Sequence, residues 1–140
     1  MKHILFICTG NSCRSAIAEA LTNHLGAGRF HAQSAGSKPV GFIHAQAIAV
    51  LARHAISTEE LFSKSWDRFA GVHFDLVVTV CDSAAQETCP VFLGKHIQLH
   101  WPIADPAAVI GTQTEIHAAF DQTFSLIKHK IEREILSAEI

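Results

Sequence analysis

The 140-residue sequence has no long apolar run and no excess of charge of one sign. Apolar stretches such as Ile4–Ile7 are far shorter than the roughly 20 residues of a membrane-spanning helix, and no signal-peptide pattern follows Met1. The 11 Lys and Arg residues nearly balance the 13 Asp and Glu residues, so the composition indicates no surface for nucleic acid or an anionic membrane. These absences predict a cytoplasmic protein that binds neither.

The sequence has few cysteines, namely Cys8, Cys13, Cys81 and Cys89. In a reducing compartment four cysteines are less often a disulfide framework than reactive thiols, metal ligands or small buried side chains. No Cys-x2-Cys motif is present, and neither the cysteines nor the 10 histidines show a familiar metal-ligand spacing. We therefore expect no catalytic metal.

Strand-like and helix-like patterns alternate along the sequence. Strand candidates recur four times, at Lys2–Ile7, Phe30–Ala35, Asp75–Val80 and His96–Trp101, and the third is a nearly continuous β-branched run. Apolar residues at helical spacing follow the first two of these segments, and they recur along the sequence after Gln113. The length suits one α/β domain, over residues 1–140, and is too small for two. The predicted architecture is a four-stranded parallel sheet flanked by helices, with binding loops at the carboxyl ends of the strands.

The segment between the first strand and the first helix has the form Cys-x5-Arg-Ser, a spacing that the composition would produce by chance about 0.02 times. Five intervening residues can wrap a loop whose backbone N–H groups point inward at the positive end of the next helix. Such a loop holds a tetrahedral oxyanion and favours the thiolate of Cys8 as a nucleophile. Arg14 adds a planar, charged fork for two oxygens. The alternative is a small buried cysteine in a strand-to-helix turn.

The residues expected to surround the oxyanion follow one another directly in the sequence. Gly10 is expected to supply unusual backbone angles, Ser15 to hydrogen-bond the Cys8 sulfur or cap the helix, and Cys13 to pack as a bystander. The full set is Thr9, Gly10, Asn11, Ser12, Cys13, Arg14 and Ser15.

Two features downstream could complete a site. Cys81 ends the third predicted strand, and Cys89 follows it across a segment whose Ser83 and Gln86 have the spacing of a capping box. Eight helical residues climb about 12 Å, whereas a disulfide needs Cα atoms roughly 4.4 to 6.8 Å apart, so any pairing would require this helix to open. The Asp-Pro pair at Asp105 is either a general acid or an ordinary turn.

Four segments together resemble the arsenate reductases built on the low-molecular-weight protein tyrosine phosphatase fold, over essentially the whole chain. The Cys-x5-Arg loop is common to both activities of this fold, whereas the Asn-Ser-Cys interior of the loop and the downstream cysteine pair resemble the reductases. The segments are CTGNSCRS from Cys8, SAG from Ser34, DLVVTVCD from Asp75 and HWPIADP from His100.

The resemblance implies a thiol-dependent oxidoreductase of arsenical resistance. Its implied catalytic residues are Cys8 and Arg14 at the arsenate, Asp105 as the proton donor, and Cys81 and Cys89 as a disulfide relay. It implies no bound cofactor, and an external reductant that is either thioredoxin or glutathione with glutaredoxin.

Some members of the resembling family hold a potassium ion behind the loop through an asparagine, a glutamate, a serine and an aspartate. The first three match Asn11, Glu19 and Ser34, whereas Lys64 stands where the aspartate would be. We expect either a structural potassium ion here or the Lys64 ammonium in its place.

Two other functions remain open at this point. A tyrosine phosphatase of this fold would use Cys8, Arg14 and Asp105 with water in place of Cys81. The chain has no Tyr, however, and Ala107 follows the Asp-Pro pair where phosphatases of this fold usually have Tyr. The other possibility is a non-catalytic module that binds an oxyanion or senses thiols.

Overall fold

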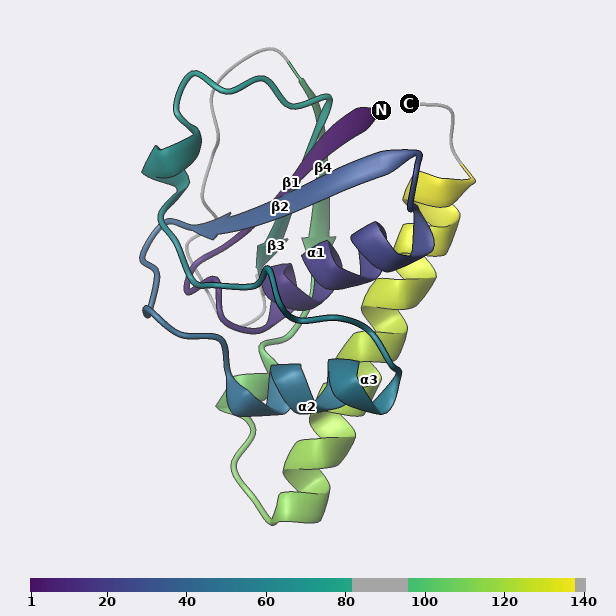
Figure 1. Ribbon diagram of the computed structural model, residues 1–140. Coiled ribbons are helices and arrows are strands. Elements are labelled where there is room, and N and C mark those ends of the chain that lie inside the picture. Colours follow the sequence, from purple (N-terminus) through teal and green to yellow (C-terminus); the bar gives the residue numbers. More distant parts are fainter. Residues whose placement is uncertain (82–95, 138–140) are drawn as a thin grey trace.

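The computed structural model describes residues 1–81 and 96–137, and its centre is a parallel sheet of four strands. The strands lie in the order β2-β1-β3-β4, and every neighbouring pair is parallel (Figure 1). The predicted α/β fold is thereby confirmed. The strands are β1 (Lys2–Cys8), β2 (Phe30–Gly36), β3 (Leu76–Cys81) and β4 (Ile97–Pro102).

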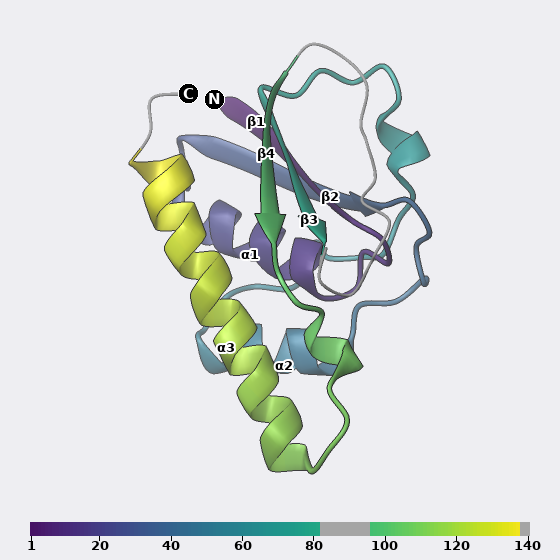
Figure 2. The ribbon, with the colours of Figure 1, turned by 180° about the vertical axis from the view of Figure 1, so that it is seen from behind.

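Three helices pack together against one face of the sheet, as Figures 1 and 2 show from opposite sides. They are α1 (Arg14–Leu25), α2 (Ala45–Arg53) and α3 (Gln113–Ile131). A reciprocal capping box between Thr112 and Glu115 starts α3, and a π-helical turn over Glu132–Leu136 prolongs it. The apolar stripe predicted for this last segment is buried from Phe120 onward.

The alternation of side chains along the strands divides the core in two. On β1, Ile4, Phe6 and Cys8 belong to the cluster that the helices cover, whereas Leu5 and Ile7 belong to a smaller cluster on the other face. That second cluster also holds Val77 of β3, together with Phe69 and Phe74 from the segment around the short 3-10 helix η1 (Trp66–Phe69). Alternation therefore sends neighbouring residues at a strand end to different faces.

The carboxyl ends of the strands carry the predicted chemistry. Cys8 and Cys81 are the last residues of β1 and β3, which are neighbours in the sheet. Asp105 caps a short 3-10 helix, η3 (Pro106–Ala108), which follows β4. The helix predicted from Ser83 lies outside the described residues. Within residues 1–81 and 96–137, no helix is both long and apolar enough to cross a membrane.

Candidate active site

The Cys8 sulfur lies at the centre of the loop that joins β1 to α1, and only 2% of the residue is exposed. The backbone N–H of Asn11 donates to the sulfur at 3.2 Å, and the Ser15 hydroxyl oxygen lies 2.9 Å from it. Because the Asn11 side-chain amide donates to the same hydroxyl at 2.9 Å, the hydroxyl proton is directed toward the sulfur. Both contacts direct a hydrogen-bond donor at the Cys8 sulfur.

A second chain segment turns the loop carbonyls away from the cavity. The carbonyl oxygens of four loop residues accept backbone hydrogen bonds of 2.9 to 3.3 Å from the segment that follows β2. With these carbonyls already paired, the loop N–H groups are left to face an anion. The pairs, acceptor first, are Cys8 with Ser37, Thr9 with Lys38, Gly10 with Val40, and Ser12 with His44.

The tight turn of the loop depends on Asn11 and Gly36. Asn11 takes the left-handed conformation, with φ of 46°, which asparagine tolerates better than most residues. Gly10, in contrast, is not among the glycines of positive φ, so the unusual angle predicted for it falls on its neighbour. A Cβ atom at Gly36 would lie 2.5 Å from the Thr9 carbonyl oxygen, so the end of β2 must be a glycine for the loop to pack against it.

A cavity of about 190 Å³ opens above the sulfur. Of the predicted loop residues, Thr9 and Ser15 do not line it, because Ser15 lies behind the sulfur and the Thr9 carbonyl faces the segment after β2. The lining residues are Cys8, Gly10, Asn11, Ser12, Cys13, Arg14, Val40, Phe42, His44, Asp105 and Ala107.

Arg14 and Asp105 meet at the cavity wall. The guanidinium is almost completely buried, and its Nη1 donates to the Ile103 carbonyl at 3.1 Å. Its Nη2 lies 3.9 Å from Oδ2 of Asp105, whose other carboxylate oxygen accepts from the Ala107 N–H at 3.0 Å. The carboxylate is 41% exposed, so water reaches it where it lines the cavity.

Cys13 lines the same cavity but differs chemically from a nucleophile. Burial, reinforced by the nearby negative charge of Asp105, raises the pKa of the Cys13 thiol to about 12. The side chain is therefore a neutral thiol at physiological pH, which agrees with the bystander role expected from the sequence.

Sequence reasoning missed the outer wall of the cavity, formed by Val40, Phe42 and His44. Val40 and Phe42 are 52% and 61% exposed, and such apolar side chains in a turn segment are the signal that could have identified them. His44 caps α2, since its Nδ1 accepts from the Gln46 N–H at 3.0 Å. That acceptor role leaves Nε2 as the protonated nitrogen of the neutral ring.

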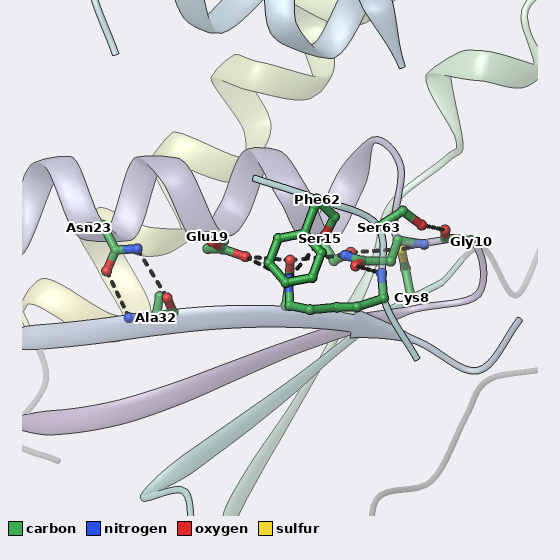
Figure 3. A network of polar contacts seen from close by, with 11 residues as sticks. Cys8, Gly10, Ser15, Glu19, Asn23, Ala32, Phe62 and Ser63 are labelled. Atoms are coloured by element: carbon green, nitrogen blue, oxygen red, sulfur yellow. Dashed lines mark hydrogen bonds and ion pairs between the residues drawn. The ribbon is translucent and has the colours of Figure 1, made fainter. Parts of the chain in front are cut away.

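A chain of buried polar contacts runs behind the loop, from the Cys8 sulfur to Glu19 (Figure 3). The Asn11 amide donates to the Ser34 hydroxyl at 2.9 Å, and this hydroxyl donates to Oε1 of Glu19 at 2.5 Å. The Asn11 side-chain oxygen accepts from the Lys64 backbone N–H at 3.0 Å. The network ties the loop to α1, to β2 and to the segment before η1.

The Lys64 ammonium closes this network. It lies 3.8 Å from Oε1 of Glu19, donates to the Phe62 carbonyl at 3.1 Å, and stands 4.3 Å from the centre of the Phe62 ring. Both charged side chains are only 6% exposed. Burial raises the pKa of Glu19 and lowers that of Lys64, and each opposes the shift of the other.

These contacts do not fit a potassium ion. The Asn11 oxygen already accepts a backbone hydrogen bond, and the Lys64 ammonium brings a positive charge to the Glu19 carboxylate. Of the two expectations from the sequence, the donor set favours the ammonium. In the part of the chain that the structure describes, no group of three or more His, Cys, Asp or Glu side chains is placed to hold a metal.

Cys81 is buried at the end of β3 and takes part in a disulfide bond, whereas Cys8 and Cys13 are free thiols. Cys89 lies outside the described residues, so its pairing with Cys81 stays a prediction. The Cys81 sulfur lies 3.9 Å from Nδ1 of His100 on β4.

Comparison with known proteins places this site in a family. The model of the low molecular weight phosphotyrosine protein phosphatases matches residues 3–138. The chain belongs to this family. Within it, an arsenate reductase of Bacillus licheniformis is 35% identical over 133 residues, which covers 94% of each chain. The resemblance to the arsenate reductases of this phosphatase family is thereby confirmed.

Solved structures of arsenate reductases share the fold. One from Archaeoglobus fulgidus is 26% identical, with a TM-score of 0.71 over 93% of this chain and 99% of that chain. A thioredoxin-dependent arsenate reductase of Corynebacterium glutamicum is also 26% identical, with a TM-score of 0.69 over 99% of this chain and 64% of that one.

The buried ion pair of this phosphatase-family member can be tested by substitution. Lys64→Met should lower the free energy of unfolding by about 3 kcal/mol, because it leaves a carboxylate buried without its cation. Adding Glu19→Gln should recover much of the loss, since the double variant buries no lone charge. Urea unfolding measures both effects, with the exposed Lys128→Met as the matched control.

Urea unfolding also tests whether the Lys64 ammonium or a potassium ion lies beside Glu19. If the ammonium takes the place of an ion, the urea midpoint of the wild-type protein should be equal in potassium chloride and sodium chloride. A marked stabilisation by potassium over sodium would contradict this assignment.

Proposed function

We propose that the protein is a cytoplasmic arsenate reductase that converts arsenate to arsenite by a relay of three thiols. The observation that carries the proposal is the meeting of Cys8 and Arg14 in an oxyanion-sized cavity, with a second functional cysteine, Cys81, at the end of the adjacent strand. The arsenate reductases among its relatives support the choice of oxyanion.

In the first step the Cys8 thiolate attacks arsenate held by the loop N–H groups and the Arg14 fork. A sulfur–arsenic bond forms, one arsenic–oxygen bond breaks, and Asp105 gives its proton so that the oxygen leaves as water. Arsenic stays in the +5 state throughout this step.

The second step moves electrons. The Cys81 thiolate attacks the Cys8 sulfur, a sulfur–sulfur bond forms, and the sulfur–arsenic bond breaks with its electron pair on arsenic. Arsenic becomes +3 and leaves as arsenite, while the two sulfurs are oxidised. Cys89 then attacks Cys81, which frees Cys8 as a thiolate and leaves the Cys81–Cys89 disulfide.

An external dithiol closes the cycle by reducing this disulfide. We propose thioredoxin as the reductant, because a thioredoxin-dependent arsenate reductase shares the fold. Glutathione with glutaredoxin is the second candidate, and both belong to the reducing cytoplasm. In this scheme arsenate and the reductant are the protein's partners, and neither nucleic acid nor a membrane takes part.

A phosphatase of the same family is the competing function. It would use the same loop, but it would have no use for Cys81. Ala107 lines the cavity directly after the Asp-Pro pair, where it offers no aromatic side chain to stack on the ring of a phosphotyrosine. This lining favours a small inorganic oxyanion.

Consumption of the reductant distinguishes an arsenate reductase from a phosphatase. The reduced protein with thioredoxin, its reductase and NADPH should consume NADPH only when arsenate is present. Cys8→Ser should abolish this consumption and any phosphatase side activity, because the serine hydroxyl has no adjacent base to ionise it. Residual turnover of the variant above a few per cent would exclude Cys8 as the nucleophile.

Asp105→Asn isolates the proton donor. We expect the first chemical step to slow about 100-fold, with nearly unchanged oxyanion binding, because the variant loses a proton and not a contact in the loop. Rapid-quench single turnover measures the rate, and competition by phosphate measures binding. An unchanged rate would reduce Asp105 to the residue that caps η3.

The order of the thiols gives the most discriminating result. Cys89→Ser should release about one arsenite per enzyme and then stop with Cys8 bonded to Cys81, whereas Cys81→Ser should release little without an added small thiol. Peptide mapping of the stalled variants identifies each disulfide. Full turnover of Cys89→Ser with thioredoxin would remove Cys89 from the relay, and rescue by glutathione with glutaredoxin alone would indicate a relay of two protein thiols.

A further inference from the structure

A single hydroxyl interrupts the apolar strand β3. Thr79 lies between Val78 and Val80 and is 1% exposed, so burying its hydroxyl costs free energy unless the group is hydrogen-bonded. The hydroxyl donates to the Leu99 carbonyl at 3.5 Å, and its oxygen lies 2.9 Å from Nδ1 of His100. Threonine at this position therefore holds a histidine ring in place.

The sheet register brings that ring to the Cys81 sulfur. Thr79 and His100 are partners across the parallel strands β3 and β4, so their side chains share a face of the sheet. Cys81 is two residues beyond Thr79 and shares that face as well. His100 Nδ1 lies 2.9 Å from the hydroxyl and 3.9 Å from the sulfur. One ring nitrogen thus contacts both groups.

We infer that His100 is the acid–base catalyst for the Cys81 thiol, and that Thr79 is its positioning residue. The inference rests on the proposed function, in which Cys81 is the second nucleophile. A nucleophile, a base within reach and a third group that orients the base form the arrangement that activates weak nucleophiles in enzymes.

Over one catalytic cycle His100 takes one proton from the Cys81 thiol and returns it. Neutral His100 takes the Cys81 thiol proton on Nδ1, which leaves a thiolate to attack the Cys8 sulfur. Before this transfer the Thr79 hydroxyl donates to the unprotonated Nδ1. Afterwards the Nδ1–H donates to the Thr79 oxygen, and the hydroxyl proton turns to the Leu99 carbonyl. When the external dithiol opens the disulfide, Cys81 leaves as a thiolate and regains the proton from His100. The ring is exposed, so it can also exchange protons with water.

This pairing also places the activation step away from the oxyanion. Ile7 is the β1 partner of Thr79, and it belongs to the face opposite to that of Cys8. In the disulfide-bonded form, Cys81 therefore lies with Thr79 and not with Cys8. The reduced enzyme must turn the end of β3 so that the thiolate reaches the Cys8 sulfur.

The test follows the reactivity of each thiol with pH in the reduced, full-length protein. Brief iodoacetamide labelling with peptide-resolved mass spectrometry gives the pH of half-maximal alkylation for Cys81 and for Cys8 separately. His100→Ala should raise the Cys81 midpoint by about one pH unit, which is tenfold less thiolate at neutral pH. The Cys8 profile should stay unchanged. Gln98→Ala, on the same face of β4, is the matched control.

Single-turnover arsenite release should slow about tenfold in His100→Ala, in proportion to the lost thiolate. Thr79→Val keeps the shape of the side chain and removes the hydroxyl. It should also raise the pH midpoint of Cys81 alkylation and slow arsenite release, each by a smaller factor than His100→Ala. His100→Asn can still hydrogen-bond the Thr79 hydroxyl but cannot take up a proton, so it should keep the melting temperature while releasing arsenite as slowly as His100→Ala.

An unchanged Cys81 alkylation profile in His100→Ala would overturn the inference. So would a wild-type release rate in His100→Asn, which would make the ring a structural element only. Neither result bears on the relay itself, which is tested separately by the turnover of Cys8→Ser, Cys81→Ser and Cys89→Ser. The labelling needs no turnover, so the two failures can be told apart.

Discussion

Asn11 is the residue on which the candidate site depends. Its left-handed backbone makes the loop turn, its N–H donates to the Cys8 sulfur, and its side-chain amide bridges the hydroxyls of Ser15 and Ser34. Its remaining oxygen accepts from the backbone of Lys64. Because every polar group of this side chain is used and buried, the loop cannot relax without leaving several groups unpaired, and each such loss is costly. The loop is therefore organised for an anion before one binds.

A buried ion pair behind the loop supports the position of Asn11. Glu19 and Lys64 form a buried pair, and Ser34 links the carboxylate to Asn11. A buried pair of this kind adds little net stability. Its value here is positional, since it fixes Ser34 and, through Ser34, the Asn11 side chain that orients Ser15 toward the sulfur. The ammonium belongs to the chain, so the network does not depend on an ion from solution.

The alternation of the strands separates the two halves of the proposed chemistry. The oxyanion loop and the helices share one face of the sheet, and Cys81 lies with Thr79 and His100 on the other. The second nucleophile, Cys81, is thereby kept away from Cys8 in the disulfide-bonded form, near the exposed His100 ring.

The sequence by itself determined the four parallel strands, the strand-end positions of Cys8 and Cys81, and the loop with its arginine, because hydrophobic periodicity and motif spacing are local properties. It also indicated Lys64 as a replacement for an ion. Tertiary structure decided which loop residue takes the strained angle, which carbonyls are turned outward by the segment after β2, and that Val40, Phe42 and His44 wall the cavity. It alone brought His100 to Cys81, since that contact depends on the register of two strands whose pairing no local pattern encodes.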